Sequence, residues 1–149
     1  MKAFHFPLQK ALEWRRLELE LEEARYKQQA AALAELDRQR AELEASGVRA
    51  EIQVREWNPV AASDLSALGG FRLRVRRDQD QLAKERQACV RKLAEQQKQM
   101  LEARRRCHLL ERLKERRLAE WKAGCSREVE EIAAESYLAR WSQGEPYNG

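Results

Sequence analysis

Apolar side chains recur at three- and four-residue steps along almost the whole chain. The longest uninterrupted stretch, Phe71 to Trp141, contains no proline and a single glycine, Gly124. Its regularly spaced apolar or small residues are Val75, Leu82, Cys89, Leu93, Met100, Cys107, Leu110, Trp121, Cys125, Val129 and Ile132. Arg, Lys, Glu and Gln fill the positions between them, which is the pattern of one long amphipathic helix. Such a helix extends on the order of 100 Å at about 1.5 Å per residue, and it needs a partner helix to cover its apolar face.

The first half of the chain has the pattern of that partner. Two apolar rows at heptad spacing run through it, and they consist of Leu12, Leu19, Tyr26 and Leu33, and of Leu8, Leu36 and Leu43. Several positions of the same seam are polar, namely Arg15, Glu22, Gln29 and Arg40. The seam is therefore weaker than that of a leucine zipper, but it predicts a helix over residues 8–56 that continues through Ser46-Gly47.

A turn separates the two helical patterns at residues 57–65. Asn58-Pro59 is the first firm stop, because a residue that precedes proline is pushed out of the α region. Ser63 or Asp64 can cap the next helix. Because two glycines in a helix cost together about 2 kcal/mol relative to alanine, we place the start of the second helix near residue 66, with firm helix from Phe71, and its end near residue 141. The chain is thus predicted to be one all-α domain over residues 1–149, a long antiparallel two-helix coiled coil, or helical hairpin.

The predicted hairpin has helices of unequal length. A turn centred near residue 61 places Leu8 near Lys114, so the second helix outruns the first by roughly 25 residues, or about 40 Å. The protruding segment, about Arg116 to Arg140, contains Trp121 and ends beside Trp141. An unpaired helix with exposed tryptophans favours a partner protein.

Composition supports an extended helical protein. Charged residues make up 36% of the chain and aromatic residues only 7%, and the mean hydropathy is −0.82. No apolar run approaches the roughly 20 residues that span a bilayer, and the first twelve residues lack the apolar core of a secretory signal. We therefore expect a cytoplasmic protein without direct membrane insertion.

Candidate chemistry is sparse, so we expect no enzymatic activity, no metal and no cofactor. Cys89, Cys107 and Cys125 are spaced by five helical turns, which puts them on one face about 27 Å apart, too far for a shared metal or an intrahelical disulfide. They are interpreted as small seam residues. His108 has no second ligand in metal register, and His5 lies in a short leader that we expect to be mobile. A two-helix rod offers no cleft that excludes water.

Basic residues cluster in the second helix. Residues 104–122 contain eight basic and three acidic residues, an excess of five positive charges, and four arginines occupy residues 72–77. Such clusters bind phosphate backbones or acidic protein surfaces. Because these arginines spread over several faces of a helix, an acidic protein partner or a plainly solvated face is favoured over nucleic acid, and no nucleic-acid partner is expected.

Three motifs follow one another along the chain: FHFPLQKALEWR at residues 4–15, LERLKERR at residues 110–117, and EEIA at residues 130–133. In this order they resemble the FliJ family of the flagellar export apparatus. The family opens with F-x-F-x-L-x-x-x-L-x-x-R, has an L-E-K-L-K-E-R segment further on, and then shows D-E-I-A or D-E-F-A, where Glu130 here replaces the aspartate. The order and spacing of the three motifs extend over nearly the whole chain.

The resemblance implies a fold, partners and sites. Family members are antiparallel two-helix coiled coils that insert their terminal ends into the hexameric flagellar export ATPase, contact the export gate in the inner membrane, and in some cases bind export chaperones. The matching positions imply ATPase contacts at Arg112, Lys114, Arg116, Arg117, Trp121, Glu131 and Ile132. Matching positions early in the second helix imply gate contacts at Phe71, Val75 and Leu82, although the arginines between them depart from the family pattern.

The resulting hypothesis is a non-catalytic stalk or adaptor of flagellar type III export. It is cytoplasmic and associates peripherally with the export apparatus at the inner membrane. Three alternatives remain open from the sequence: the equivalent stalk protein of an injectisome, a nucleic-acid-binding coiled coil, and a self-associating coiled coil without a ring partner.

Overall fold

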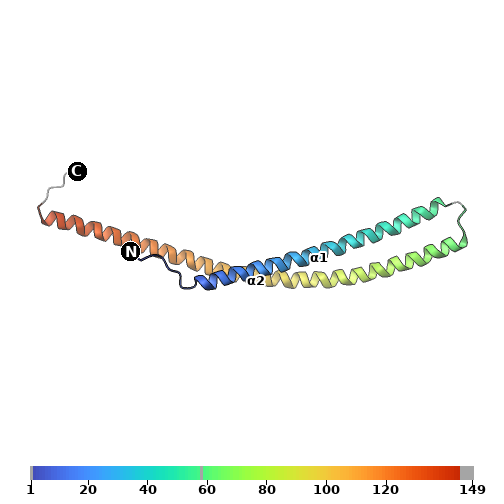
Figure 1. Cartoon of the computed structure of the whole chain (residues 1–149), viewed down its shortest axis with the longest axis horizontal. Helices are drawn as coiled ribbons and strands as arrows, with labels where there is room; N and C mark the ends of the chain where they lie inside the picture. Colours follow the sequence, from blue (N-terminus) through green and yellow to red (C-terminus); the bar gives the residue numbers. More distant parts are fainter. Residues whose placement is uncertain (1, 58, 145–149) are drawn as a thin grey trace. The chain divides into compact units, whose positions relative to one another are not determined.

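Two long helices make up nearly all of the protein. A computed structural model describes residues 2–57 and 59–144. Helix α1 spans Gln9–Glu56 and helix α2 spans Ala62–Ser142, with 48 and 81 residues (Figure 1). No strand occurs in these described ranges. The two helices pack against each other, so the all-α helical hairpin predicted from the sequence is confirmed. The stop predicted at Asn58 lies outside the described residues.

The chain divides into two compact units, and both helices contribute to each. One unit consists of Met1–Leu17 with Arg104–Gly149, and we call it the terminal unit. The other consists of Glu18–Ala103, and we call it the hairpin unit because it includes the connection between the helices.

Cross-helix contacts of the hairpin unit define an antiparallel register. Arg72 pairs with Glu51 at 2.9 Å, and Arg86 pairs with Asp37 at 2.7 Å. The Cys89 thiol lies 3.8 Å from the carbonyl oxygen of Gln29. The partner in α1 moves toward the N-terminus as the residue in α2 moves toward the C-terminus, so the two helices run side by side in opposite directions, as Figure 1 shows for this part of the chain.

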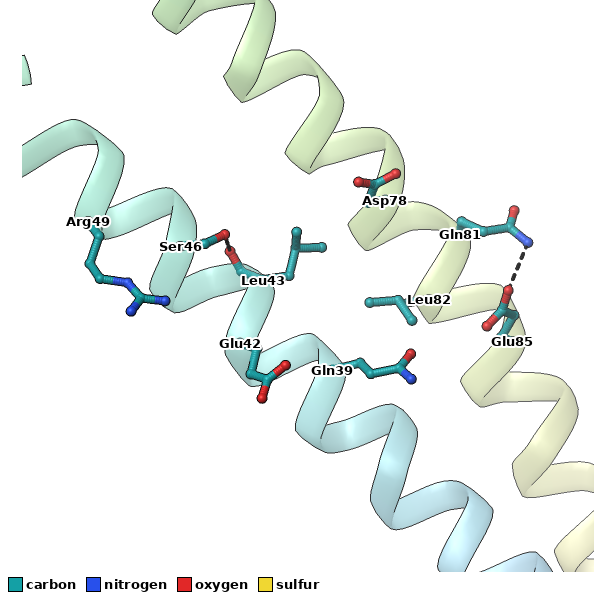
Figure 2. Close-up of a pocket in the computed structure, with 9 residues that line it drawn as sticks. All are labelled: Gln39, Glu42, Leu43, Ser46, Arg49, Asp78, Gln81, Leu82 and Glu85. Atoms are coloured by element: carbon teal, nitrogen blue, oxygen red, sulfur yellow. Dashed lines mark hydrogen bonds between the residues drawn. The ribbon is translucent and has the colours of Figure 1, made fainter.

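The predicted seam lies between the helices of this unit. Leu19, Tyr26, Leu33, Leu36 and Leu43 are all half-buried. Figure 2 shows Leu43 and Leu82 pointing toward one another from the two helices. Within this unit Arg40 differs from the other predicted seam positions of α1: it is exposed and lies 3.8 Å from Glu44 on its own helix. Two helices alone cover each seam residue on one side only, which explains why most of them stay half-buried.

One polar pair of the seam, Gln96 and Glu22, forms hydrogen bonds across the interface. The Gln96 amide donates to the backbone carbonyl of Glu22 at 3.3 Å and also to the Glu22 carboxylate. A half-buried amide that lacked such partners would lose its hydrogen bonds with water without compensation. This pairing favours one register, because a shift of one helical turn would take the Glu22 oxygens away from the Gln96 amide, whereas the ion pair of Glu22 with Arg25 lies within α1.

Helix α2 begins earlier than the sequence predicted. The Ala61 N–H donates to the Asp64 carboxylate at 3.2 Å, and the Leu65 N–H donates to the Ala61 carbonyl at 3.3 Å. Ala61 is therefore the N-cap. Asp64, at the third helical position, accepts the N–H of the N-cap residue, which is one of the two hydrogen bonds of a capping box. Gly69-Gly70 lies inside the helix instead of delaying it.

Candidate protein-docking site

The N-terminal leader, residues 2–8, packs against α2 within the terminal unit. It therefore differs from the mobile segment that we expected. Phe6 is only 5% exposed, and Leu12, in the first turn of α1, is 0% exposed. The Gln9 N–H donates to the Phe6 carbonyl at 3.1 Å, and the Leu12 N–H donates to the Leu8 carbonyl at 2.9 Å. These bonds turn the leader into the helix and bring its aromatic side chains to the apolar face of α2.

Trp121 of α2 contacts the first residues of the leader. Its indole N–H donates to the Lys2 carbonyl at 3.1 Å, and its ring centroid lies 6.0 Å from that of Phe4 with the planes tilted by 57°. Edge-tilted aromatic pairs at this separation are favourable. Leu8 and Leu113 line the same cavity under the leader, close to the register predicted from the sequence.

An ion pair joins the start of α1 to α2. The Arg16 guanidinium lies 3.3 Å from the Glu111 carboxylate, and the ring of His108, on α2 itself, lies 4.0 Å from the same carboxylate. The thiol of Cys107 is 3.7 Å from Glu111. Burial raises the pKa of the Cys107 thiol above its ordinary value, and the Glu111 carboxylate adds to the increase. This thiol is therefore a poor nucleophile at neutral pH, in agreement with its interpretation as a seam residue.

Beyond Cys125, α2 has no covering segment within the terminal unit. Every residue from Ser126 to Ser142 is exposed, and we call this stretch the terminal helix segment. Its large apolar side chains are between 52% and 74% exposed, and they are Val129, Ile132, Tyr137, Leu138 and Trp141. Cys125, Val129 and Ile132 continue the seam of α2 at the same three- and four-residue steps. The terminal helix segment is thus a helix with an apolar row that no other described part of this unit buries.

The residues implied in ATPase binding fall into two groups. Arg112, Arg116 and Arg117 are exposed and Lys114 is half-buried, in the part of α2 beside the leader. Glu131 and Ile132 are exposed in the terminal helix segment. Trp121 lies between the groups and is covered in part by the leader, so the uncovered helix begins after Cys125 instead of at Arg116. The centres of the two groups lie about 25 Å apart along the helix at its standard rise.

The residues implied in gate binding lie in the seam of the hairpin unit. Phe71, Val75 and Leu82 are half-buried. Phe71 and Val75 line a groove with Gly47, and a Cβ atom on Gly47 would lie 3.7 Å from Val75 Cγ1. These three side chains hold the two helices together, and their role in binding the gate stays a prediction.

The docking of the leader was missed by sequence reasoning. The available signal was the pair of aromatic residues, Phe4 and Phe6, ahead of the first helix. Large aromatic side chains in such a leader are stabilised when they pack against an apolar face of another segment. Periodicity gave no information on which part of α2 supplies that face, because the leader is too short to have a period.

The described residues provide no site for a metal or a bilayer span. They contain no group of three or more His, Cys, Asp or Glu side chains arranged to hold a metal ion. None of their helices has a stretch that is long and apolar enough to cross a membrane. No protein-family model, no curated protein and no solved structure matches the chain.

Proposed function

We propose that this protein is a non-catalytic stalk or adaptor of the bacterial flagellar type III export apparatus. In this role it acts at the cytoplasmic side of the inner membrane and binds the hexameric export ATPase through the C-terminal part of α2. The proposal rests on the resemblance of residues 4–15, 110–117 and 130–133 to the FliJ family, together with the geometry of the terminal unit.

The observation that carries the proposal is the exposed apolar row of the terminal helix segment. Val129 and Ile132 continue a seam whose earlier members are covered by the leader and α1. A single helix with such a row can insert into a ring of subunits and lay the row into an apolar groove that the subunits form. The exposed Arg112, Arg116 and Arg117 would contribute by attracting acidic side chains at the entrance of the ring.

The mechanism would be stabilisation of the assembled ring. A helix that binds only the hexamer shifts the equilibrium from free ATPase subunits toward the hexamer by mass action. Free helix at about 100 times its dissociation constant would favour the hexamer by about 2.7 kcal/mol. The protein would thereby increase ATPase activity without contributing a catalytic group.

The proposed partners extend to the export gate and to export chaperones. Phe71, Val75 and Leu82 are the proposed contacts with the gate. The stalk protein of an injectisome has the same expected rod and is the alternative, and the genes that neighbour this one, flagellar or injectisome, discriminate between the two systems.

The decisive test is an ATPase and pull-down assay with the export ATPase from the same genome. Deletion of residues 126–149 should abolish stimulation, while the helical circular dichroism per residue and the packing of the leader are retained, because the terminal helix segment buries no side chain. Retained stimulation would show that ring docking does not use this segment.

A matched pair of substitutions tests the apolar row itself. Ile132 and Leu138 are equally exposed, at 61%, but only Ile132 lies on the seam row. Ile132→Ser should weaken ATPase binding by about 10- to 100-fold, the loss expected for one buried aliphatic side chain, whereas Leu138→Ser should bind like the parent protein. Charge reversal at Arg112, Arg116 and Arg117 should reduce stimulation and leave helicity intact.

A further inference from the structure

The connected end of the hairpin unit exposes apolar side chains. We call residues 48–57 and 60–77 the hairpin tip. Its large exposed apolar side chains come from both helices and the connection, are between 38% and 57% exposed, and are Val48, Ile52, Trp57, Val60, Leu65 and Leu73. They stand outside the seam, so they do not hold α1 against α2.

The hairpin tip is also cationic. It contains six arginines and three carboxylates, and they are Arg49, Arg55, Arg72, Arg74, Arg76 and Arg77, and Glu51, Glu56 and Asp64. Arg72 is paired with Glu51. Within the described part of the chain, Arg74, Arg76 and Arg77 have no carboxylate within 4.0 Å. The tip therefore presents a positive charge that its own acidic residues do not neutralise.

Apolar and cationic side chains share one side of the tip. Val48, Arg72 and Arg76 line the same groove, which also contains Glu51, the partner of Arg72, and Glu44. Ile52 lies one helical turn after Val48, and Leu65 lies two turns before Arg72, so both belong to this side. Aliphatic residues interleaved with arginines in this way can enter the boundary of a bilayer, because the guanidinium groups reach phosphate oxygens while the apolar side chains enter the acyl region.

We infer that the hairpin tip binds the surface of an anionic lipid bilayer. The interaction is interfacial, since no described helix is apolar enough to span the membrane. Trp57 at the end of α1 suits the polar boundary of the bilayer, where tryptophan is enriched. The inference does not depend on the proposed ATPase partner, which concerns the other unit.

Vesicle flotation with the full chain tests the inference. The protein should float with vesicles of phosphatidylcholine containing about one third phosphatidylglycerol and should not float with pure phosphatidylcholine, because each arginine near an anionic surface contributes roughly 1 kcal/mol, or about 5-fold in binding. Arg76→Gln combined with Arg77→Gln should therefore weaken binding by about 25-fold, because Arg76 lies in the groove with Val48 and Arg77 lies one helical turn after the exposed Leu73. Ile52→Ser should also weaken it, by about 10-fold or more.

Two controls exclude general charge and apolar effects. Arg91→Gln combined with Lys92→Gln removes the same charge from exposed positions outside the tip. Leu101→Ser removes a side chain that is as exposed as Ile52. Both controls should float like the parent protein, and circular dichroism verifies that every variant is helical. Flotation that is absent with anionic vesicles, or that the controls reduce as much as the tip variants do, overturns the inference. Retention of the tip by an acidic protein without flotation would assign it to a protein partner instead.

Discussion

Leu12 is the side chain whose truncation should have the largest effect on the terminal unit. It is 0% exposed, while most seam residues are only half-buried. Leu→Ala at fully buried sites costs about 2–5 kcal/mol, and less where the surroundings can collapse into the space. An interface between a leader and two helices can collapse more readily than a multilayered core. We therefore expect Leu12→Ala to lower the free energy of opening this unit by about 2–3 kcal/mol.

Hydrogen exchange followed by mass spectrometry measures this effect unit by unit. A loss of about 2–3 kcal/mol accelerates exchange through local opening by about 30- to 150-fold. The acceleration should appear in peptides from residues 9–17 and 104–121, while peptides from the hairpin unit should exchange as before. Global denaturation is less informative here, because two compact units need not unfold together.

Leu17→Ala is the matched control for this prediction. Leu17 lies on the same helix and is 63% exposed, so the same substitution should change stability by no more than about 0.5 kcal/mol. Equal acceleration in both variants would refute the reasoning from burial. Acceleration that spreads equally through the hairpin unit would refute the independent opening of the terminal unit.

Three other predictions concern glycine, thiol and carboxylate groups. Gly69→Ala and Gly70→Ala should each stabilise the hairpin by about 0.5–1 kcal/mol in urea unfolding, since a Cβ at either position meets no atom within 4 Å; destabilisation would indicate a hinge that needs these glycines. Cys125 should react with an aromatic disulfide reagent faster than the two buried cysteines, and urea should make all three equal. Hydrogen bonds from Arg38 hold the pKa of Glu35 below its ordinary value of 4.5. The helix stabilisation from this carboxylate is present above that value and is lost as pH falls below it. In acid titrations of helicity, Arg38→Gln should remove this part of the transition.

The fold could be predicted because it depends on a local period. The heptad rows through Leu12, Leu19 and Tyr26 are visible without knowledge of any contact, and an apolar row of that length needs a second helix. The antiparallel register followed from one turn signal at Pro59 and the lengths of the two patterns. The spacing of apolar residues and turn signals can be read directly from a sequence.

The start of α2 was predicted too late because the low helix propensity of the two glycines was considered without the capping and packing that oppose it. Gly69-Gly70 costs about 2 kcal/mol in a helix, but the Asp64 carboxylate caps the helix earlier and Leu68 and Phe71 pack into the seam. Capping and packing together outweigh the two glycines.

The contacts that shape the candidate site depend on register and could not be read from spacing. The sequence shows Phe4 and Trp121 as separate aromatic residues, and only the length of the leader and the exact pairing of α1 with α2 bring them together. The same holds for Gln96 and Glu22 in the seam. By contrast, the continuation of the apolar row to Ile132 was visible in the sequence, and its exposure followed from the unequal helix lengths.

The leader on Trp121 has a consequence for the order in which the protein folds. Cross-helix bonds of the hairpin unit join residues 49, 60 and 74 positions apart, whereas Arg16 and Glu111 are 95 apart and Lys2 and Trp121 are 119 apart. Because closing a longer loop costs more chain entropy, pairing can proceed like a zipper from the connection outward, and each bond formed shortens the loop that the next must close. By this route the leader is the last segment to reach its native contacts, after the two helices have paired.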